Sequence, residues 1–170
     1  MLSHDMIKDL VKIQQLGNLN ENENFRFRSY LKMQDPDRID IIVNGLYQKY
    51  TSAIDCTTCA NCCIVLQTLI SKKDIKRIIR SLNMSAEEFM REYSEINMEG
   101  DRVLKDLPCR FLENKKCAIY RDRPYECRSY PHMHKKGFTY RLLGVIDNYS
   151  VCPIVFNVYE ELKVILRFKN

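Results

Sequence analysis

Hydrophobic residues recur every three to four positions in several stretches of the chain, which is the spacing of an amphipathic helix. Three of these stretches follow a residue type that caps helices. Asp35 precedes a proline, and Ser71 and Ser85 each stand three residues before an acidic residue. The pattern predicts helices over residues 5–16, ending before Gly17, over the segments opened by Asp35, Ser71 and Ser85, and from Ile154 to about Phe168.

The stretches between these helices predict loops and short extended segments. Residues 18–24 are polar and predict a loop, and Gly100-Asp101 predicts a turn. Strand-forming residues bounded by turn residues favour extended segments. These are expected at 102–107, 109–120 and 138–146, with Glu113-Asn114-Lys115 as a hairpin loop.

These elements predict an α+β fold, a small and mainly helical domain with short strands or a hairpin, organised around a cysteine-ligated metal centre. Residues 1–50 contain no cysteine and are expected to form a helical N-terminal segment. Residues 51–170 are expected to form a cysteine-cluster metal-binding domain that ends in the C-terminal helix.

Composition places the chain among ordinary globular proteins and indicates a reducing compartment. The 170 residues are 45% hydrophobic and 29% charged. Residues 1–9 carry charges where a signal peptide needs an apolar run, and no stretch has the ~18 uninterrupted apolar residues of a membrane span. We therefore expect a cytoplasmic protein without a membrane association, whose cysteines bind metal rather than pair as disulfides.

Eight cysteines carry the candidate chemistry, at positions 56, 59, 62, 63, 109, 117, 127 and 152. Cys56, Cys59 and Cys62 have the C-x2-C-x2-C spacing of ferredoxin-type loops, whose fourth ligand is remote. Cys63 is adjacent to Cys62, and neighbouring side chains diverge, so the two are not expected to serve one site equally. Either two tetrads form, or a single four-cysteine site forms and the other cysteines pack as thiols.

The spacing favours an iron–sulfur cluster, with [4Fe–4S] as the preferred form, over zinc. Zinc accepts four thiolates, but paired C-x2-C knuckles are its stronger signal, and here four single cysteines follow one cluster. His132 and His134 could add ligands, although such a pair is more often exposed or hydrogen-bonded.

Residues 101–141 contain eleven basic and five acidic residues, a surplus of six positive charges in a chain of net charge +5. One interpretation is a surface for nucleic acid or an acidic partner. The preferred interpretation is that Arg110, Arg121, Arg123 and Arg128 offset the negative charge of thiolates around a metal. A solvated basic face is the third alternative.

The order and context of these motifs resemble the YkgJ-like CxxCxxCC family, described as a zinc- or iron-chelating domain. The resemblance covers roughly residues 50–155. It rests on the cysteine cluster, on Pro108-Cys109-Arg110-Phe111, and on the segment from Cys117 to Pro131. It implies that all eight cysteines are potential ligands: Cys56, Cys59, Cys62, Cys63, Cys109, Cys117, Cys127 and Cys152. It also implies a relation to flagellin lysine-N-methylases, which are larger.

Three functions remain open at this point. The first is an iron–sulfur protein with a redox or protein-modification role, acting with a protein partner or protein substrate. The second is a structural zinc module that binds a protein or nucleic acid. The third is a lysine N-methylase-like enzyme, for which the sequence offers no glycine-rich loop after a strand.

Overall fold

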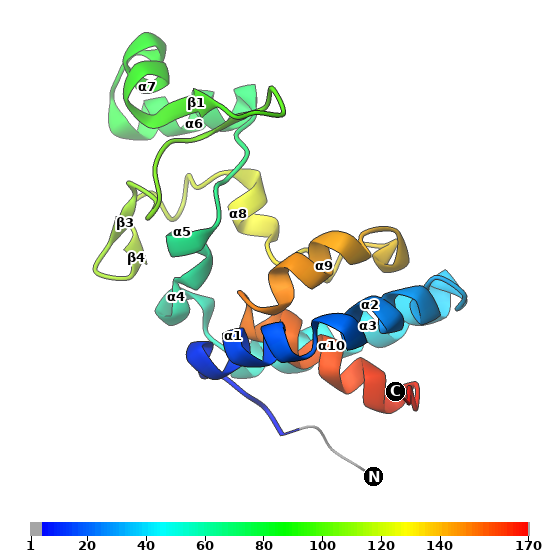
Figure 1. The fold of residues 1–170 in the computed structure, drawn as a ribbon. Helices are drawn as coiled ribbons and strands as arrows, with labels where there is room; N and C mark the ends of the chain where they lie inside the picture. Colours follow the sequence, from blue (N-terminus) through cyan, green and yellow to red (C-terminus); the bar gives the residue numbers. More distant parts are fainter. Residues whose placement is uncertain (1–4, 170) are drawn as a thin grey trace. The chain divides into compact units, whose positions relative to one another are not determined.

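The computed structural model describes residues 5–169 and divides them into two compact units (Figure 1). The first, here called the helical unit, comprises the chain up to Asp55 and from Pro131 onward. The second, here called the cysteine unit, comprises Cys56–Tyr130. Helices dominate and two small antiparallel strand pairs accompany them, so the α+β class is confirmed.

The helical unit consists mainly of helices, and one of them, α3, begins at the cap that the sequence predicts. Asp35 caps α3, because its side chain accepts from the backbone N–H groups of Asp37 and Arg38, and Pro36 occupies the first turn. The elements are α1 (Leu10–Leu19), α2 (Glu21–Leu31), α3 (Pro36–Ala53), the 3-10 turn η1 (Phe138–Tyr140), α9 (Leu142–Tyr149) and α10 (Pro153–Ile165).

Three expectations in this unit were wrong. Helix α1 does not end before Gly17, because the missing side chain there lets the helix approach Ser150. The expected loop at 18–24 is mostly helix α2, whose first turn has acidic residues that suit the helix dipole. The expected strand at 138–146 is η1 followed by α9, since its buried positions recur at helical spacing.

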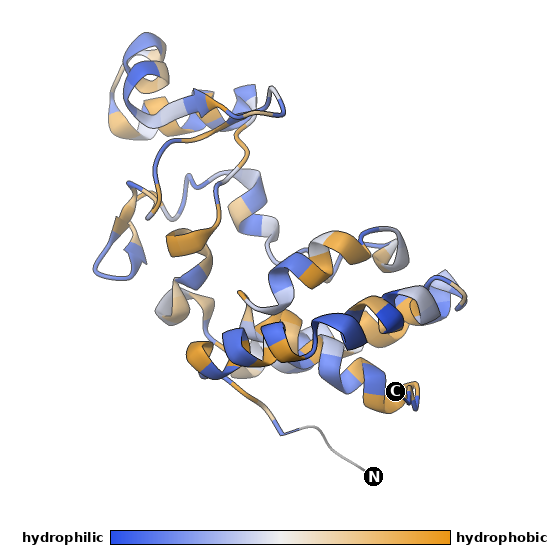
Figure 2. Ribbon diagram, in the orientation of Figure 1, coloured by the Kyte–Doolittle hydropathy of each residue, from blue (hydrophilic) through white to orange (hydrophobic). Residues whose placement is uncertain are grey.

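Aromatic and aliphatic side chains fill the interior of the helical unit. Phe27 is fully buried and contacts the rings of Tyr159, Tyr30 and Phe168, with centroids 4.9–6.0 Å away. Helix α10 is buried along most of its length and packs against α3, α9 and α1. Figure 2 shows hydrophobic and hydrophilic bands alternating along these helices, as expected when one face packs on a core.

The cysteine unit is built from shorter elements. Ser71 opens α6 with a complete capping box, in which its hydroxyl accepts from the Asp74 N–H and the Asp74 carboxylate accepts from the Ser71 N–H. Ser85 caps α7 by accepting from the N–H of Glu88. The helices are α4 (Cys56–Cys59), α5 (Asn61–Val65), α6 (Lys72–Leu82), α7 (Ala86–Tyr93) and α8 (Tyr125–Ser129).

Two antiparallel strand pairs complete this unit. Strand β1 (Ser94–Ile96) pairs with β2 (Arg102–Leu104) around the expected turn at Gly100-Asp101. Strand β3 (Leu112–Glu113) pairs with β4 (Lys116–Cys117), which confirms the hairpin. Its two loop residues, Asn114 and Lys115, both have positive φ, which matches the twist of a two-residue hairpin turn.

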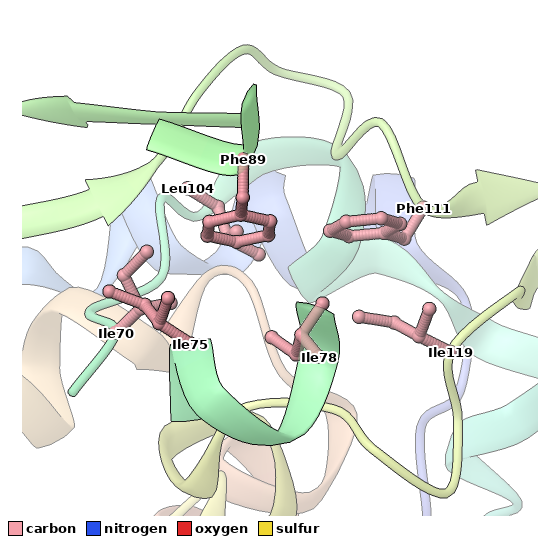
Figure 3. Close-up of a cluster of buried hydrophobic side chains, with 7 residues drawn as sticks. All are labelled: Ile70, Ile75, Ile78, Phe89, Leu104, Phe111 and Ile119. Carbon is pink, nitrogen blue, oxygen red and sulfur yellow. The ribbon is translucent and has the colours of Figure 1, made fainter. Parts of the chain in front are cut away.

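A small hydrophobic cluster lies between α6, α7 and the strand segments of the cysteine unit (Figure 3). Phe111 stacks on Tyr93, which stacks on Phe89, with centroids 5.0 and 5.6 Å apart. Two cysteines, Cys109 and Cys117, pack against this cluster. Its buried members are Ile70, Ile75, Ile78, Phe89, Leu104, Phe111 and Ile119.

Among residues 5–169, no single helix is long and apolar enough to cross a membrane. Helices α9 and α10 reach such a length only when taken together, and a bend of 115° separates them.

Candidate metal centre

The first four cysteines lie on two short helices separated by one residue in the left-handed region. Cys56 and Cys59 are the ends of α4, and Ala60 has a φ of 54°. The N–H of Cys63 then donates to the carbonyl of Ala60, which starts α5 in a new direction. The C-x2-C-x2-C-C stretch is therefore a kinked pair of helical turns rather than one helix, so its sulfurs are not confined to a single helical face.

The second half of the cysteine unit meets this stretch at Cys63. The N–H of Cys109 donates to the carbonyl of Cys63 over 2.8 Å. The chain then turns back, with the Leu112 N–H on the Cys109 carbonyl, and Leu112 pairs with Cys117 in the hairpin. These backbone bonds bring residues 63, 109 and 117 to one side of the unit.

Hydrogen-bond donors already point at three of the sulfurs. The backbone N–H groups of Phe111 and Ile119 donate to the sulfurs of Cys109 and Cys117, in each case two residues on, and lower the pKa of each thiol. The Thr68 hydroxyl lies 3.5 Å from the sulfur of Cys127. Donors of this kind stabilise a thiolate, which is the form that binds metal.

Burial and the charges of neighbouring thiols shift the pKa of three cysteines in this region. Burial is the largest influence on Cys109, Cys117 and Cys127 and raises the pKa of each, to about 11 for Cys127. Negative charge on Cys63 raises the pKa of all three further. Cys109 and Cys117 likewise raise the pKa of Cys127. The four sulfurs therefore form one electrostatic cluster, here called the thiol tetrad: Cys63, Cys109, Cys117 and Cys127.

Cys63 is the member of the tetrad most easily deprotonated. A hydrogen bond from the Cys62 side chain lowers the pKa of Cys63 to about 7, against the opposing effect of burial. The two adjacent side chains therefore lie within hydrogen-bond reach of each other, and the expectation that they do not serve one site equally stays a prediction.

The other cysteines and the two histidines are spread over both units, and helix α4, which carries Cys56 and Cys59, packs against β4, which carries Cys117. Cys56 is exposed and Cys59 is half-buried. Cys152 belongs to the helical unit, where it is 6% exposed at the start of α10. His132 has a positive φ and lies in a turn, and the His134 ring is 5.6 Å from that of Tyr47. The pair is therefore not part of a strand.

The arginines near the cysteines are mostly engaged with backbone carbonyls. Arg128 donates to the carbonyls of Arg121 and Arg123, and Arg123 donates to that of Tyr120 while it lies 3.7 Å from the Tyr120 ring centroid. Arg123 also lowers the pKa of Cys117. One arginine of the four thus acts on a thiol of the tetrad, as expected, and Arg110 instead pairs with Asp106.

The donor set of the tetrad fits a metal that prefers sulfur. All eight cysteines fall within residues 5–169 and are thiols rather than halves of disulfides. Four soft sulfur ligands suit zinc and iron–sulfur clusters alike. Within the same residues, no three Cys, His, Asp or Glu side chains converge closely enough to hold an ion in their present rotamers.

The fold and the tetrad define a class, small α+β proteins with a cysteine cluster suited to metal. The chain belongs to the CxxCxxCC family, whose profile, "Putative zinc- or iron-chelating domain", matches residues 55–144. An uncharacterized protein of Methanocaldococcus jannaschii, MJ0661, is 30% identical over 99 residues. The match covers 56% of this chain and 50% of MJ0661, so the chain spans about half the length of that relative. No solved structure matches the chain.

Sequence reasoning did not identify three residues that shape this region. Thr68 and Arg77 carry no motif of their own, and Asp74 was recognised only as part of a capping box. In the structure, Thr68, Arg77 and Asp74 each make a hydrogen bond to a residue more than 40 positions away, and sequence spacing does not reveal such bonds.

Proposed function

We propose that the thiol tetrad holds an iron–sulfur cluster, preferably [4Fe–4S], and that the protein works in electron transfer or a redox step of protein modification. The observation that carries the proposal is that backbone hydrogen bonds and the hairpin bring Cys63, Cys109 and Cys117 together. The charges of these three thiols also raise the pKa of Cys127, which comes from a fourth segment of the cysteine unit. When bound, the cluster supplies one-electron redox chemistry. Rotation of the cysteine side chains about Cα–Cβ on binding is part of the proposal.

The residues around the tetrad would set the properties of the centre. The N–H groups of Phe111 and Ile119 and the hydroxyl of Thr68 donate to three of the sulfurs, and Arg123 adds positive charge near Cys117. Such donors and charges offset the negative charge of four thiolates and raise a cluster's potential. The packing of Cys109 and Cys117 on the hydrophobic cluster excludes water from one side of the centre.

We propose a second, less favoured set of ligands outside the tetrad: Cys56, Cys59, Cys62 and Cys152. Cys62 already serves the tetrad by donating a hydrogen bond to Cys63. If the C-x2-C-x2-C cysteines bind a second metal centre, elemental analysis should find more than one centre per chain.

The partner is proposed to be a protein rather than nucleic acid. The guanidinium groups of Arg123, Arg128 and Arg141 donate to backbone carbonyls, which fixes three of the eleven basic side chains of this region to the protein itself. The cysteine unit also exposes apolar side chains, including Val65, Leu69, Leu107 and Tyr125, which suit a protein surface.

Anaerobic purification followed by iron, sulfide and zinc analysis tests the proposal. A cluster predicts iron and acid-labile sulfide in equal amounts, with a brown colour bleached by dithionite. Stoichiometric zinc without iron would replace the proposal with the structural zinc module, which has the same donor set. Protein that contains neither iron nor zinc, when purified anaerobically from cells supplied with both, would contradict metal binding altogether.

A further inference from the structure

We infer that Asp74 and Arg77 of α6 are positioning residues for the metal centre, because they fasten the segment that carries Cys127. The inference rests on the proposed function, in that it takes the tetrad as the metal-binding donor set.

Asp74 is the anchor of this junction. It is 3% exposed and its carboxylate accepts four hydrogen bonds. Two come from the N–H and the hydroxyl of Ser71, at 2.9 and 2.6 Å. One comes from Arg77 at 2.7 Å, and one from the backbone N–H of Tyr125 at 3.0 Å. The last bond crosses from α6 to the first residue of α8, two residues before Cys127.

Arg77 extends the same junction backward along the chain. Its guanidinium donates to the carbonyl of Asp122 over 3.2 Å and to that of Arg123 over 2.8 Å, while it remains paired with Asp74. Residues 122–125 are thus held by one buried carboxylate and one planar donor fork. This segment, here called the clamp segment, lies between Cys117 and Cys127 and includes Arg123, which acts on the Cys117 thiol.

Apolar packing constrains the clamp segment at Pro124, which is buried, but not at the exposed Tyr125. A cavity of about 450 Å³ opens there, and its lining includes Ile70, Asp74, Arg77 and Tyr125. Tyr125 is 57% exposed. The polar contacts of Asp74 and Arg77 therefore supply the constraint that a hydrophobic core would supply elsewhere. Polar partners behind a metal ligand commonly change affinity by ~10–100-fold when they are removed.

The experiment compares Arg77→Met and Asp74→Asn with a matched control, Ser85→Ala. Ser85 caps α7 in the same unit, and its cap bond, donated by the N–H of Glu88, stays within that helix turn. Arg77→Met keeps the capping box and the Asp74–Tyr125 bond, so α6 still starts normally. Two quantities are measured on the full chain: the dissociation constant for Zn²⁺ against a competing chelator, and the alkylation rate of each cysteine in metal-free reduced protein by mass spectrometry.

We expect both clamp variants to weaken Zn²⁺ binding by about tenfold. We expect them to speed alkylation of Cys127 severalfold relative to Cys117, which is held by the hairpin instead. Ser85→Ala should change neither quantity, although it lowers stability. A purely structural role would instead shift all cysteines together and would do so in Ser85→Ala as well.

The inference is overturned if Arg77→Met and Asp74→Asn leave the Cys127-to-Cys117 alkylation ratio within twofold of wild type. It is also overturned if Ser85→Ala reproduces their effect at equal loss of stability. Failure of wild-type protein to bind Zn²⁺ or iron would end the proposed function alone, because the alkylation ratio still reports whether the clamp positions Cys127.

Discussion

The helical unit and the cysteine unit differ in what fills their interiors. Of the twelve largest fully buried side chains in the described part of the chain, ten belong to the helical unit and only Ile78 and Phe89 to the cysteine unit. The cysteine unit buries a cluster of seven hydrophobic residues and packs two thiols against it. One unit has a core made of aromatic rings and aliphatic chains, while the other has a small core that borders on the proposed metal centre.

Because the cysteine unit has the smaller hydrophobic core, bound metal should matter more for its stability than for that of the helical unit. Units of roughly 70–80 residues rarely gain enough from a hydrophobic core alone, and they commonly add a metal or disulfides. The cysteine unit, Cys56–Tyr130, is of that size and its cysteines are thiols. We therefore expect its stability to depend on metal, and that of the helical unit to depend on packing and buried charge.

The largest expected effect comes from replacing Cys117 and Cys127 together by serine. Metal content should fall to background, and the cysteine unit should lose most of the binding free energy, which is on the order of 10 kcal/mol for structural metal sites. Amide hydrogen exchange should show protection over residues 56–130 reduced to that of the metal-free wild type, with protection of α3 and α10 unchanged. Cys152→Ala is the control, because this buried cysteine lies in the helical unit.

Two outcomes would remove the contrast between the units. The double serine variant could keep its metal and its protection, in which case the tetrad is not the site. Alternatively, Cys152→Ala could also abolish metal binding, which would make Cys152 a ligand as the family resemblance implies.

A buried charge in the helical unit gives the next largest effect. Lys163 is 5% exposed and pairs with Glu160 at 2.6 Å and Glu23 at 2.9 Å. Lys163→Met keeps the length of the side chain but removes the buried positive charge that faces both carboxylates, which should cost about 3 kcal/mol. Urea unfolding followed at the helical unit measures it. Lys49→Met is the matched control, because its pair with Glu161 is half-exposed and should be worth under ~1 kcal/mol.

Metal content should stay unchanged in Lys163→Met if the units are stabilised separately. Equal losses of stability in Lys163→Met and Lys49→Met would show that the buried pair contributes no more than a surface pair.

Local signals in the sequence were sufficient where a short stretch determines the structure. The caps at Asp35, Ser71 and Ser85 start helices in the structure, and the hairpin turns at Asn114-Lys115. Each depends on hydrogen bonds or φ preferences within about four residues, so the sequence contains the cause.

The sequence-based expectations were wrong or incomplete where contacts between residues far apart in the sequence determine the structure. Gly17 lies inside α1 rather than after it, and its missing side chain leaves room for Ser150, which is far along the chain. The membership of the thiol tetrad also depends on distant contacts, since the Cys109 N–H finds the Cys63 carbonyl only after folding. In the structure, residues 131–169 belong to the same unit as the N-terminal helices. That residues 51–170 act as one metal-binding domain stays a prediction.

Gly17 and Gly45 offer a matched pair inside the helical unit. A Cβ at Gly17 would lie 2.6 Å from the Cβ of Ser150, whereas one at Gly45 meets no described atom within 4 Å. Gly17→Ala should therefore destabilise by about 2 kcal/mol through overpacking. Gly45→Ala should stabilise by up to about 1 kcal/mol through helix propensity. Thermal unfolding of the helical unit measures both, and a Gly17→Ala variant as stable as wild type would show that α1 does not depend on this approach.

The smallest expected effect is a pH dependence confined to the cysteine unit. Burial tends to raise the pKa of Asp74, but hydrogen bonds from Ser71, Arg77 and Tyr125 outweigh it and hold the pKa below the usual value of an aspartate. A carboxyl with a depressed folded pKa stabilises above its unfolded pKa, near 4, and loses that contribution as pH falls through the folded pKa. The contribution should be on the order of 1 kcal/mol.

The measurement is the unfolding free energy of metal-free protein between pH 6 and pH 2.5, followed by exchange protection in α6. Wild type should lose stability below about pH 4 more steeply than Asp74→Asn, which lacks the titrating group. Metal-free protein is required because protonation of thiolates would otherwise dominate the pH dependence. Parallel pH profiles for the two proteins would mean that the Asp74 carboxylate does not stabilise this junction through its charge.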